Sequence, residues 1–188
     1  MSILHTNRLT LRPFEEDDAN AMYHNWTYDE RVAKYCRWSP HENLDETKAL
    51  LKMYLEQSSQ GFEYRWAILL NGTNEPIGAI DVVGTEDEGK SAEVGYVLSH
   101  DYWNKGYISE ALNIVINELF HNGFTKVIAK HHIDNIASGK VMEKCGMRYT
   151  HDSKEQKKFG SDELCDVKCY QIYKNVGSLL APNCEGES

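Results

Sequence analysis

A short polar segment, Asn104-Lys105-Gly106-Tyr107, has the residue types best suited in this sequence to bind a phosphate group. It stands between a β-branched and aromatic run, residues 93–98, and a helical apolar pattern that begins at Ile108. The N-terminus of a helix carries unpaired N–H groups and a partial positive charge, which together attract anions. Gly106 would let the main chain approach a ligand closely, and Lys105 adds a positive charge. An ordinary strand-to-helix turn without a ligand fits the same residues, so the local pattern leaves both interpretations open.

Two polar residues further along, Asn135 and Ser138, lie three positions apart at the start of another predicted helix. That spacing places them on one face of the helix, at its N-terminal end. A serine in the first turn is also a common helix cap, so a purely structural role fits it as well.

Histidine and cysteine offer little for a metal site. His131 and His132 are adjacent on a predicted strand, so they point to opposite faces and cannot chelate one ion together. Cys165 and Cys169 form a C-x3-C without a second pair at zinc spacing, and the five cysteines are irregularly placed. We therefore expect idle or buried thiols and no metal.

The elements that must position these residues can be predicted from periodicity. Residues at helical spacing form one apolar stripe: Ile108, Ala111, Leu112, Val115, Ile116 and Leu119. Alternation or β-branched content predicts strands at residues 7–14, 62–70, 77–83, 93–98, 125–132, 147–150 and 166–173. Helices are predicted after residue 15 and over 29–60 with a break near Ser39-Pro40, and residues 154–158 are predicted to be a charged loop. Three successive antiparallel strands favour an α+β fold.

Three segments carry a resemblance to a known family. Residues 102–111, Tyr-Trp-Asn-Lys-Gly-Tyr-Ile-Ser-Glu-Ala, closely resemble the acetyl-CoA pyrophosphate loop of the GNAT N-acetyltransferases. Residues 135–147 resemble the family's second signature, N-x-x-S-x-x-x-x-E-K-x-G-[FM]. Residues 7–14 resemble the T-x-R-L-x-L-R opening of the branch that contains the RimJ/RimL-type ribosomal-protein N-terminal acetyltransferases. The branch tolerates Trp103 and Ile108, where the wider superfamily prefers other residues.

This resemblance implies the GNAT fold, an α+β domain with a mostly antiparallel central sheet of six to seven strands flanked by helices. We expect one domain over residues 1–175 and a flexible tail over residues 176–188. In this fold the central strand bulges and parts from the next strand, which leaves unpaired main-chain groups. The pantetheine arm of coenzyme A can bind there like an added strand.

The resemblance also implies which residues bind acetyl-CoA, the co-substrate. The main chain of Tyr96, Val97 and Leu98 would contact pantetheine, and an N–H of Val97 or Leu98 would stabilise the oxyanion. Asn135 would bond the cofactor arm. The pyrophosphate would be held by the amides of Asn104, Lys105, Gly106, Tyr107, Ile108 and Ser109.

Two proton transfers remain, because the acceptor amine must lose a proton and the departing thiolate must gain one. Glu93, on the central strand beside the gap, is the first choice for the base, directly or through water, and Asp81 is the second. Many family members use a tyrosine as the acid at the position of Met142. The RimL-type branch uses a serine, which here is Ser138.

Composition and net charge limit the kinds of partner that this protein is expected to bind. The chain has 188 residues, a formal charge of −9 and a pI of about 5.4, which opposes nonspecific nucleic-acid binding and favours a cationic acceptor such as an amine. The sequence has no stretch long enough to span a membrane and no signal-peptide pattern, so we expect a cytoplasmic protein. Tyr35, Trp38 and Tyr54 are candidate acceptor contacts or core residues.

These observations predict an acetyl-CoA-dependent N-acetyltransferase that acts on a primary amine, either a protein N-terminal α-amine or a small-molecule amine. The alternative is a catalytically idle module that binds acyl-CoA on the same fold. Monomer and homodimer are both compatible with the sequence, and the sequence does not identify the acceptor.

Overall fold

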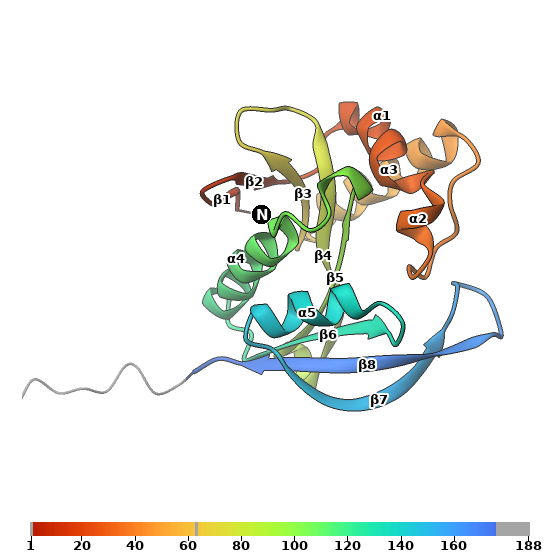
Figure 1. The fold of residues 1–188 in the computed structure, drawn as a ribbon. Helices are drawn as coiled ribbons and strands as arrows, with labels where there is room; N and C mark the ends of the chain where they lie inside the picture. The colour runs from red at the N-terminus through yellow and green to blue at the C-terminus, as the bar shows by residue number, and fades with distance from the viewer. Residues whose placement is uncertain (1, 63, 176–188) are drawn as a thin grey trace, which may run out of the picture.

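The structure is a computed structural model that describes residues 2–62 and 64–175 (Figure 1). The tail expected over residues 176–188 lies outside the described residues.

Within this described part, the strands form a sheet of eight in the order β1-β2-β3-β4-β5-β6-β8-β7. Neighbours are antiparallel except for β5 and β6, which run parallel. The strands are β1 (Leu4–His5), β2 (Leu9–Arg12), β3 (Arg65–Leu70), β4 (Pro76–Glu86), β5 (Ser91–Leu98), β6 (Lys126–His132), β7 (Arg148–Gln156) and β8 (Leu164–Tyr173). The α+β prediction is confirmed. The strand count exceeds the six to seven expected, because the short β1 adds an edge beside β2.

The helices lie on both faces of the sheet. They are α1 (Ala19–Met22), α2 (Glu30–Ala33), α3 (Leu44–Ser59), α4 (Tyr107–His121) and α5 (Ile136–Lys144), with short 3-10 and π turns between them. The predicted stripe of α4 is buried along its whole length, from Ile108 to Leu119. Gly123 follows α4 with a φ of 98°, in the left-handed region that glycine favours at a helix end.

Two apolar cores hold these layers together. One lies between α4, α5 and one face of the sheet, and it contains Trp66, Ile80 and Met142. The other lies between α1, α3 and the opposite face, and it contains Ala67 and Leu69. Successive residues of β3 therefore enter different cores, as expected for a strand covered on both sides.

The C-terminal hairpin differs from the prediction. Residues 154–156 continue β7 rather than opening a loop, and they pair with residues 164–166 of β8. Charged side chains there hid the strand signal, because both strands are exposed over this part of the hairpin. The hairpin is therefore long enough to reach past the sheet toward α2 (Figure 1).

The expected parting of the sheet is present between β5 and β6. Their ladder contains Ser91, Ala92 and Glu93 of β5 and ends at the pair Glu93–Ile128. Beyond Glu93, β5 remains paired with β4 and β6 remains paired with β8, but β5 and β6 no longer pair with each other. The bulge lies on β4, where Val83 is the extra residue opposite Glu93 and Val94, and not on the central strand as expected.

Candidate active site

A cleft of about 1560 Å³ follows the gap between β5 and β6. One end is lined by the loop before α4 and by α5, and the other by α2, α3 and the tip of the β7–β8 hairpin. We call these the loop end and the hairpin end. All three candidate acceptor contacts line the hairpin end: Tyr35, Trp38 and Tyr54.

The register of β5 shows which main-chain groups face the gap. The N–H of Ser99 donates to the carbonyl of Ile77 on β4 at 2.8 Å, so alternate residues such as Val97 also direct their main chain to β4. Tyr96 and Leu98 therefore direct theirs to the gap. The carbonyl of Leu98 accepts a bond from the Trp103 indole at 2.8 Å.

Residues 104–109, which comprise the end of the loop before α4 and the first three residues of the helix, have the backbone of an anion site. Asn104 and Gly106 have φ values of 60° and 78°, both left-handed, on either side of Lys105. Among residues 2–62 and 64–175, no side chain caps α4 at Gly106. The first N–H groups of the helix are therefore available to an anion, as the sequence predicted. We call residues 104–109 the anion loop.

Asn135 and Ser138 meet at the start of α5, as their spacing predicted. The Asn135 side chain caps the helix by accepting a bond from the Ser138 N–H at 3.3 Å. The Ser138 hydroxyl lies 2.7 Å from the hydroxyl of Tyr96. Burial raises the pKa of Tyr96, so this phenol stays protonated. Tyr96 was predicted to act through its main chain, and the role of its hydroxyl was missed. Its alternation with Val94 and Leu98 placed its side chain on the α5 face.

Glu93 lies where the gap begins, and its carboxylate is paired. Lys130 on β6 places its Nζ 2.9 Å from Glu93 and 2.8 Å from Glu155 on β7. The pKa of Lys130 is raised, because these two carboxylates outweigh the opposing effect of desolvation, so the ammonium is charged. Local spacing could not identify this lysine, because α4 separates it from Glu93 along the chain.

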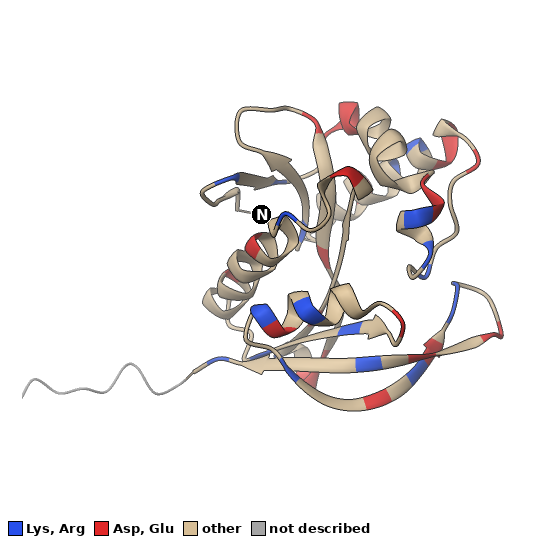
Figure 2. Cartoon of the chain, in the orientation of Figure 1, with Lys and Arg blue, Asp and Glu red and all other residues tan. Residues whose placement is uncertain are grey.

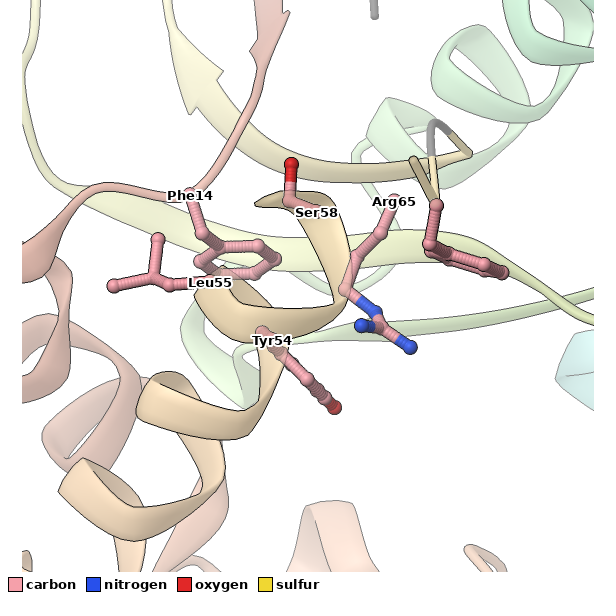
Figure 3. A pocket seen from close by; sticks show the side chains of 6 residues that line it. Phe14, Tyr54, Leu55, Ser58 and Arg65 are labelled. Atoms are coloured by element: carbon pink, nitrogen blue, oxygen red, sulfur yellow. The ribbon is translucent and has the colours of Figure 1, made fainter. Parts of the chain in front are cut away.

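Asp81, the second candidate base, lies on β4 opposite Gly95. Its carboxylate is 3.1 Å from Arg65 Nε, yet desolvation raises the pKa of Asp81 above its ordinary value. The Arg65 guanidinium lies 3.8 Å from the centre of the Tyr54 ring. Figure 3 shows these two side chains extending to the same side, beside a small cavity also lined by Phe14.

The charge of the cleft is opposite to that of the chain. Eight lysines and arginines and four acids line it, whereas the whole chain carries −9. Figure 2 shows basic residues on α5 and around α2, and both regions line the cleft. The excess of acid therefore lies elsewhere on the molecule, and the cleft suits an anionic ligand better than the overall charge suggested.

Metal and disulfide chemistry find no support in residues 2–62 and 64–175. They contain no group of three His, Cys, Asp or Glu side chains placed to hold a metal ion. Cys36, Cys145, Cys165 and Cys169 are free thiols, and Cys184 lies outside the described residues. No helix of this part is long and apolar enough to cross a membrane.

Comparison with known proteins identifies the family to which this chain belongs. Residues 8–148 match the model of the acetyltransferase (GNAT) domain. The uncharacterized N-acetyltransferase p20 of Bacillus licheniformis is 29% identical over 179 residues, covering 93% of this chain and 97% of the relative. The crystal structure of a GNAT-family acetyltransferase from Bacillus anthracis is 27% identical with a TM-score of 0.77, covering 92% of this chain and 98% of that one.

The fold is also that of RimL, a ribosomal alpha-N-protein acetyltransferase solved in complex with coenzyme A. The TM-score is 0.77 at 20% identity, over 91% of this chain and 97% of that one. Because the domain model covers most of the chain and includes the anion loop, β5 and α5, the comparison and the geometry agree. This chain belongs to the GNAT acetyltransferase family.

Proposed function

We propose that this protein transfers the acetyl group of acetyl-CoA to a primary amine. The observation that carries the proposal is the gap between β5 and β6 beside the uncapped start of α4. Acetyl-CoA supplies the activated acetyl group as a thioester, and the protein supplies position and electrostatics.

The parts of acetyl-CoA, from the pyrophosphate to the thioester, would lie in sequence from the anion loop along β5 to Glu93. The amides of the anion loop would hold the pyrophosphate. From Leu98 back to Val94 the strand borders the gap over about 13 Å, at about 3.3 Å per residue, and alternate residues direct their main chain into it. Pantetheine bound there would direct the thioester toward Glu93. The N–H of Leu98 or Tyr96, rather than that of Val97, would stabilise negative charge on the thioester oxygen.

Asn135 lies beside this path. It is proposed to bond the pantetheine arm through its amide nitrogen, because its oxygen already caps α5.

Glu93 is proposed to take the proton from the amine, directly or through a water. Amines have pKa values of about 8 to 10.4, so a base is required near neutral pH. The Lys130 ammonium, 2.9 Å from the Glu93 carboxylate, fixes the position of this side chain. Asp81 remains the competing base, and its raised pKa brings it closer to a base's working range.

Ser138 is proposed to return a proton to the sulfur as the C–S bond breaks. Its hydroxyl would donate a proton to the sulfur and take one in turn from the nitrogen of the tetrahedral intermediate, while the protonated Tyr96 hydroxyl, 2.7 Å away, positions the serine oxygen. The products are then an amide and free coenzyme A thiol, and the proton taken by Glu93 returns to solvent.

The acceptor class is proposed to be a protein N-terminal α-amine or a small-molecule amine. RimL, with the same fold, acts on a ribosomal protein N-terminus by its description. The motif at residues 7–14, resembling the RimJ/RimL-type branch, supports the first class.

The test is a screen of peptides with free N-termini and small amines, run with radiolabelled acetyl-CoA and a thiol-release assay. We expect label transfer to at least one class of amine, with stoichiometric thiol release. Coenzyme A binding without transfer to any amine would support the idle binding module instead.

A further inference from the structure

Arg8, at the start of the sheet, contacts the anion loop nearly a hundred residues further along the chain. It belongs to the segment resembling T-x-R-L-x-L-R, a motif that the proposed chemistry leaves without a role. The Arg8 Nη1 donates to the carbonyl of Lys105 at 2.9 Å. The guanidinium also lies 4.5 Å from the centre of the Tyr107 ring. One side chain thus holds both sides of Gly106.

The same guanidinium is fixed by Glu110, one turn into α4. Arg8 Nε and Nη2 each lie 2.7 Å from Glu110 Oε2. The other oxygen, Oε1, accepts the Arg8 N–H at 3.0 Å and the Thr6 hydroxyl at 2.5 Å. The first turn of α4 is therefore tied to residues 6–8 by both carboxylate oxygens.

The bond to Lys105 fixes the direction of a peptide plane. In a trans peptide the C=O of one residue and the N–H of the next point in opposite directions. Because Arg8 holds the Lys105 carbonyl, the N–H of Gly106 is directed away from Arg8. Gly106 lines the cleft on one side and packs against Arg8 on the other, where a Cβ would meet Nη2 at 3.5 Å.

We propose that Arg8 and Glu110 form a brace that presets the anion loop for the pyrophosphate of the acyl donor. The inference rests on the proposed function. Both are positioning residues, because they act on the loop from the side away from the gap. Preset amides bind a phosphate without the cost of ordering the loop at the moment of binding.

The test compares two acyl donors that differ in the pyrophosphate. Acetyl-CoA has it, whereas acetyl-pantetheine ends before it. In Arg8→Gln and Glu110→Gln we expect KM for acetyl-CoA to rise about fivefold, equivalent to about 1 kcal/mol. The kcat should be unchanged, and so should kcat/KM for acetyl-pantetheine. The double variant should lose no more than either single variant, because one interaction is removed in all three.

Two further variants separate bracing from charge and from general stability. Arg8→Lys keeps the positive charge but loses the planar fork, so it should behave like Arg8→Gln. Arg12→Gln breaks another arginine–carboxylate pair, at the end of β2, where two guanidinium nitrogens lie 2.8 Å from the two Asp18 oxygens. It should lower Tm without changing the ratio between the two donors.

Equal losses with both donors would overturn the brace and leave a structural role only. A loss in Arg8→Gln without one in Glu110→Gln would show instead that Arg8 binds the phosphate itself. Titration of coenzyme A and pantetheine by calorimetry gives the same comparison without turnover. An inactive wild-type enzyme would therefore count against the proposed function and leave the brace testable.

Discussion

The two ends of the cleft are built from different parts of the chain. At the loop end, the proposed ligand contacts are mostly main-chain groups of β5 and the anion loop, which follow one another within residues 94–109. At the hairpin end, side chains from α2, α3, β3, β4 and β7 converge, and its carboxylates are held in ion pairs. The first end can bind one common donor by a local motif, whereas the second can change its acceptor through single side chains.

A contact at the hairpin end sharpens this contrast. Lys158, at the tip of the β7–β8 hairpin, donates to the carbonyl of Ala33 at the end of α2 and to those of Cys36 and Trp38 after it, at 2.8 to 2.9 Å. The Phe159 N–H donates to the Arg37 carbonyl at 2.7 Å. The hairpin end of the cleft is therefore assembled from segments more than a hundred residues apart.

The largest effect is expected where the two ends meet, at Glu93. Glu93→Gln should lower kcat about 100-fold, because general bases contribute at least about that much, while coenzyme A affinity stays unchanged. Glu155→Gln is the matched control, because it removes the other carboxylate on Lys130. Steady-state kinetics and calorimetry measure both. Equal losses in kcat and in coenzyme A affinity would transfer the base role to Asp81 or to water.

The next largest effect is expected at the paired hydroxyls of Ser138 and Tyr96. Ser138→Ala should lower kcat about 30-fold, about 2 kcal/mol, because the developing thiolate loses a charge-assisted hydrogen bond. Tyr96→Phe should cost less, and the double variant should match Ser138→Ala. With S-(4-nitrophenyl) thioacetate, whose thiolate leaves without a proton, Ser138→Ala and the wild-type enzyme should react at similar rates. A near-normal rate in Ser138→Ala with acetyl-CoA would remove the serine from the mechanism.

A smaller effect is expected in the anion loop, on affinity rather than on rate. Gly106→Ala places a Cβ on a residue with φ of 78°, which costs about 1–2 kcal/mol, so Kd for coenzyme A should rise about tenfold. Gly123→Ala, at φ of 98° after α4, carries similar strain away from the cleft. It should lower Tm alike and leave Kd unchanged. Equal Kd values in the two variants would contradict the anion site.

The smallest effect is expected at the hairpin tip. Lys158→Met removes the three bonds to Ala33, Cys36 and Trp38. The KM for the acceptor should therefore rise about threefold, a loss of binding free energy under about 1 kcal/mol, with the KM for acetyl-CoA unchanged. Lys154→Met is the control, because Lys154 pairs with Asp166 within the hairpin itself. A change in the acetyl-CoA KM alone would show that the two ends are not independent.

The same contrast explains how much the sequence could predict. The anion loop, the stripe of α4 and the pairing of Asn135 with Ser138 were predictable, because each depends on local spacing. The Lys130 partner of Glu93 and the Lys158 contacts were not, since they depend on strand register and hairpin length. The hydroxyl of Tyr96 could have been found from alternation along β5 together with the position of Ser138. The site assignments themselves remain predictions until a variant tests them.

The three-residue ladder between β5 and β6 has a mechanical consequence. It divides the sheet into a block of β1 to β5 and a block of β6 to β8, joined by this ladder, the helices and the hairpin contacts. A molecule that lies along the gap between β5 and β6 and contacts both blocks would hold them in a fixed relative position. Its binding should therefore stiffen the whole protein, and at a hundredfold excess over Kd add about 2.7 kcal/mol to the free energy of unfolding.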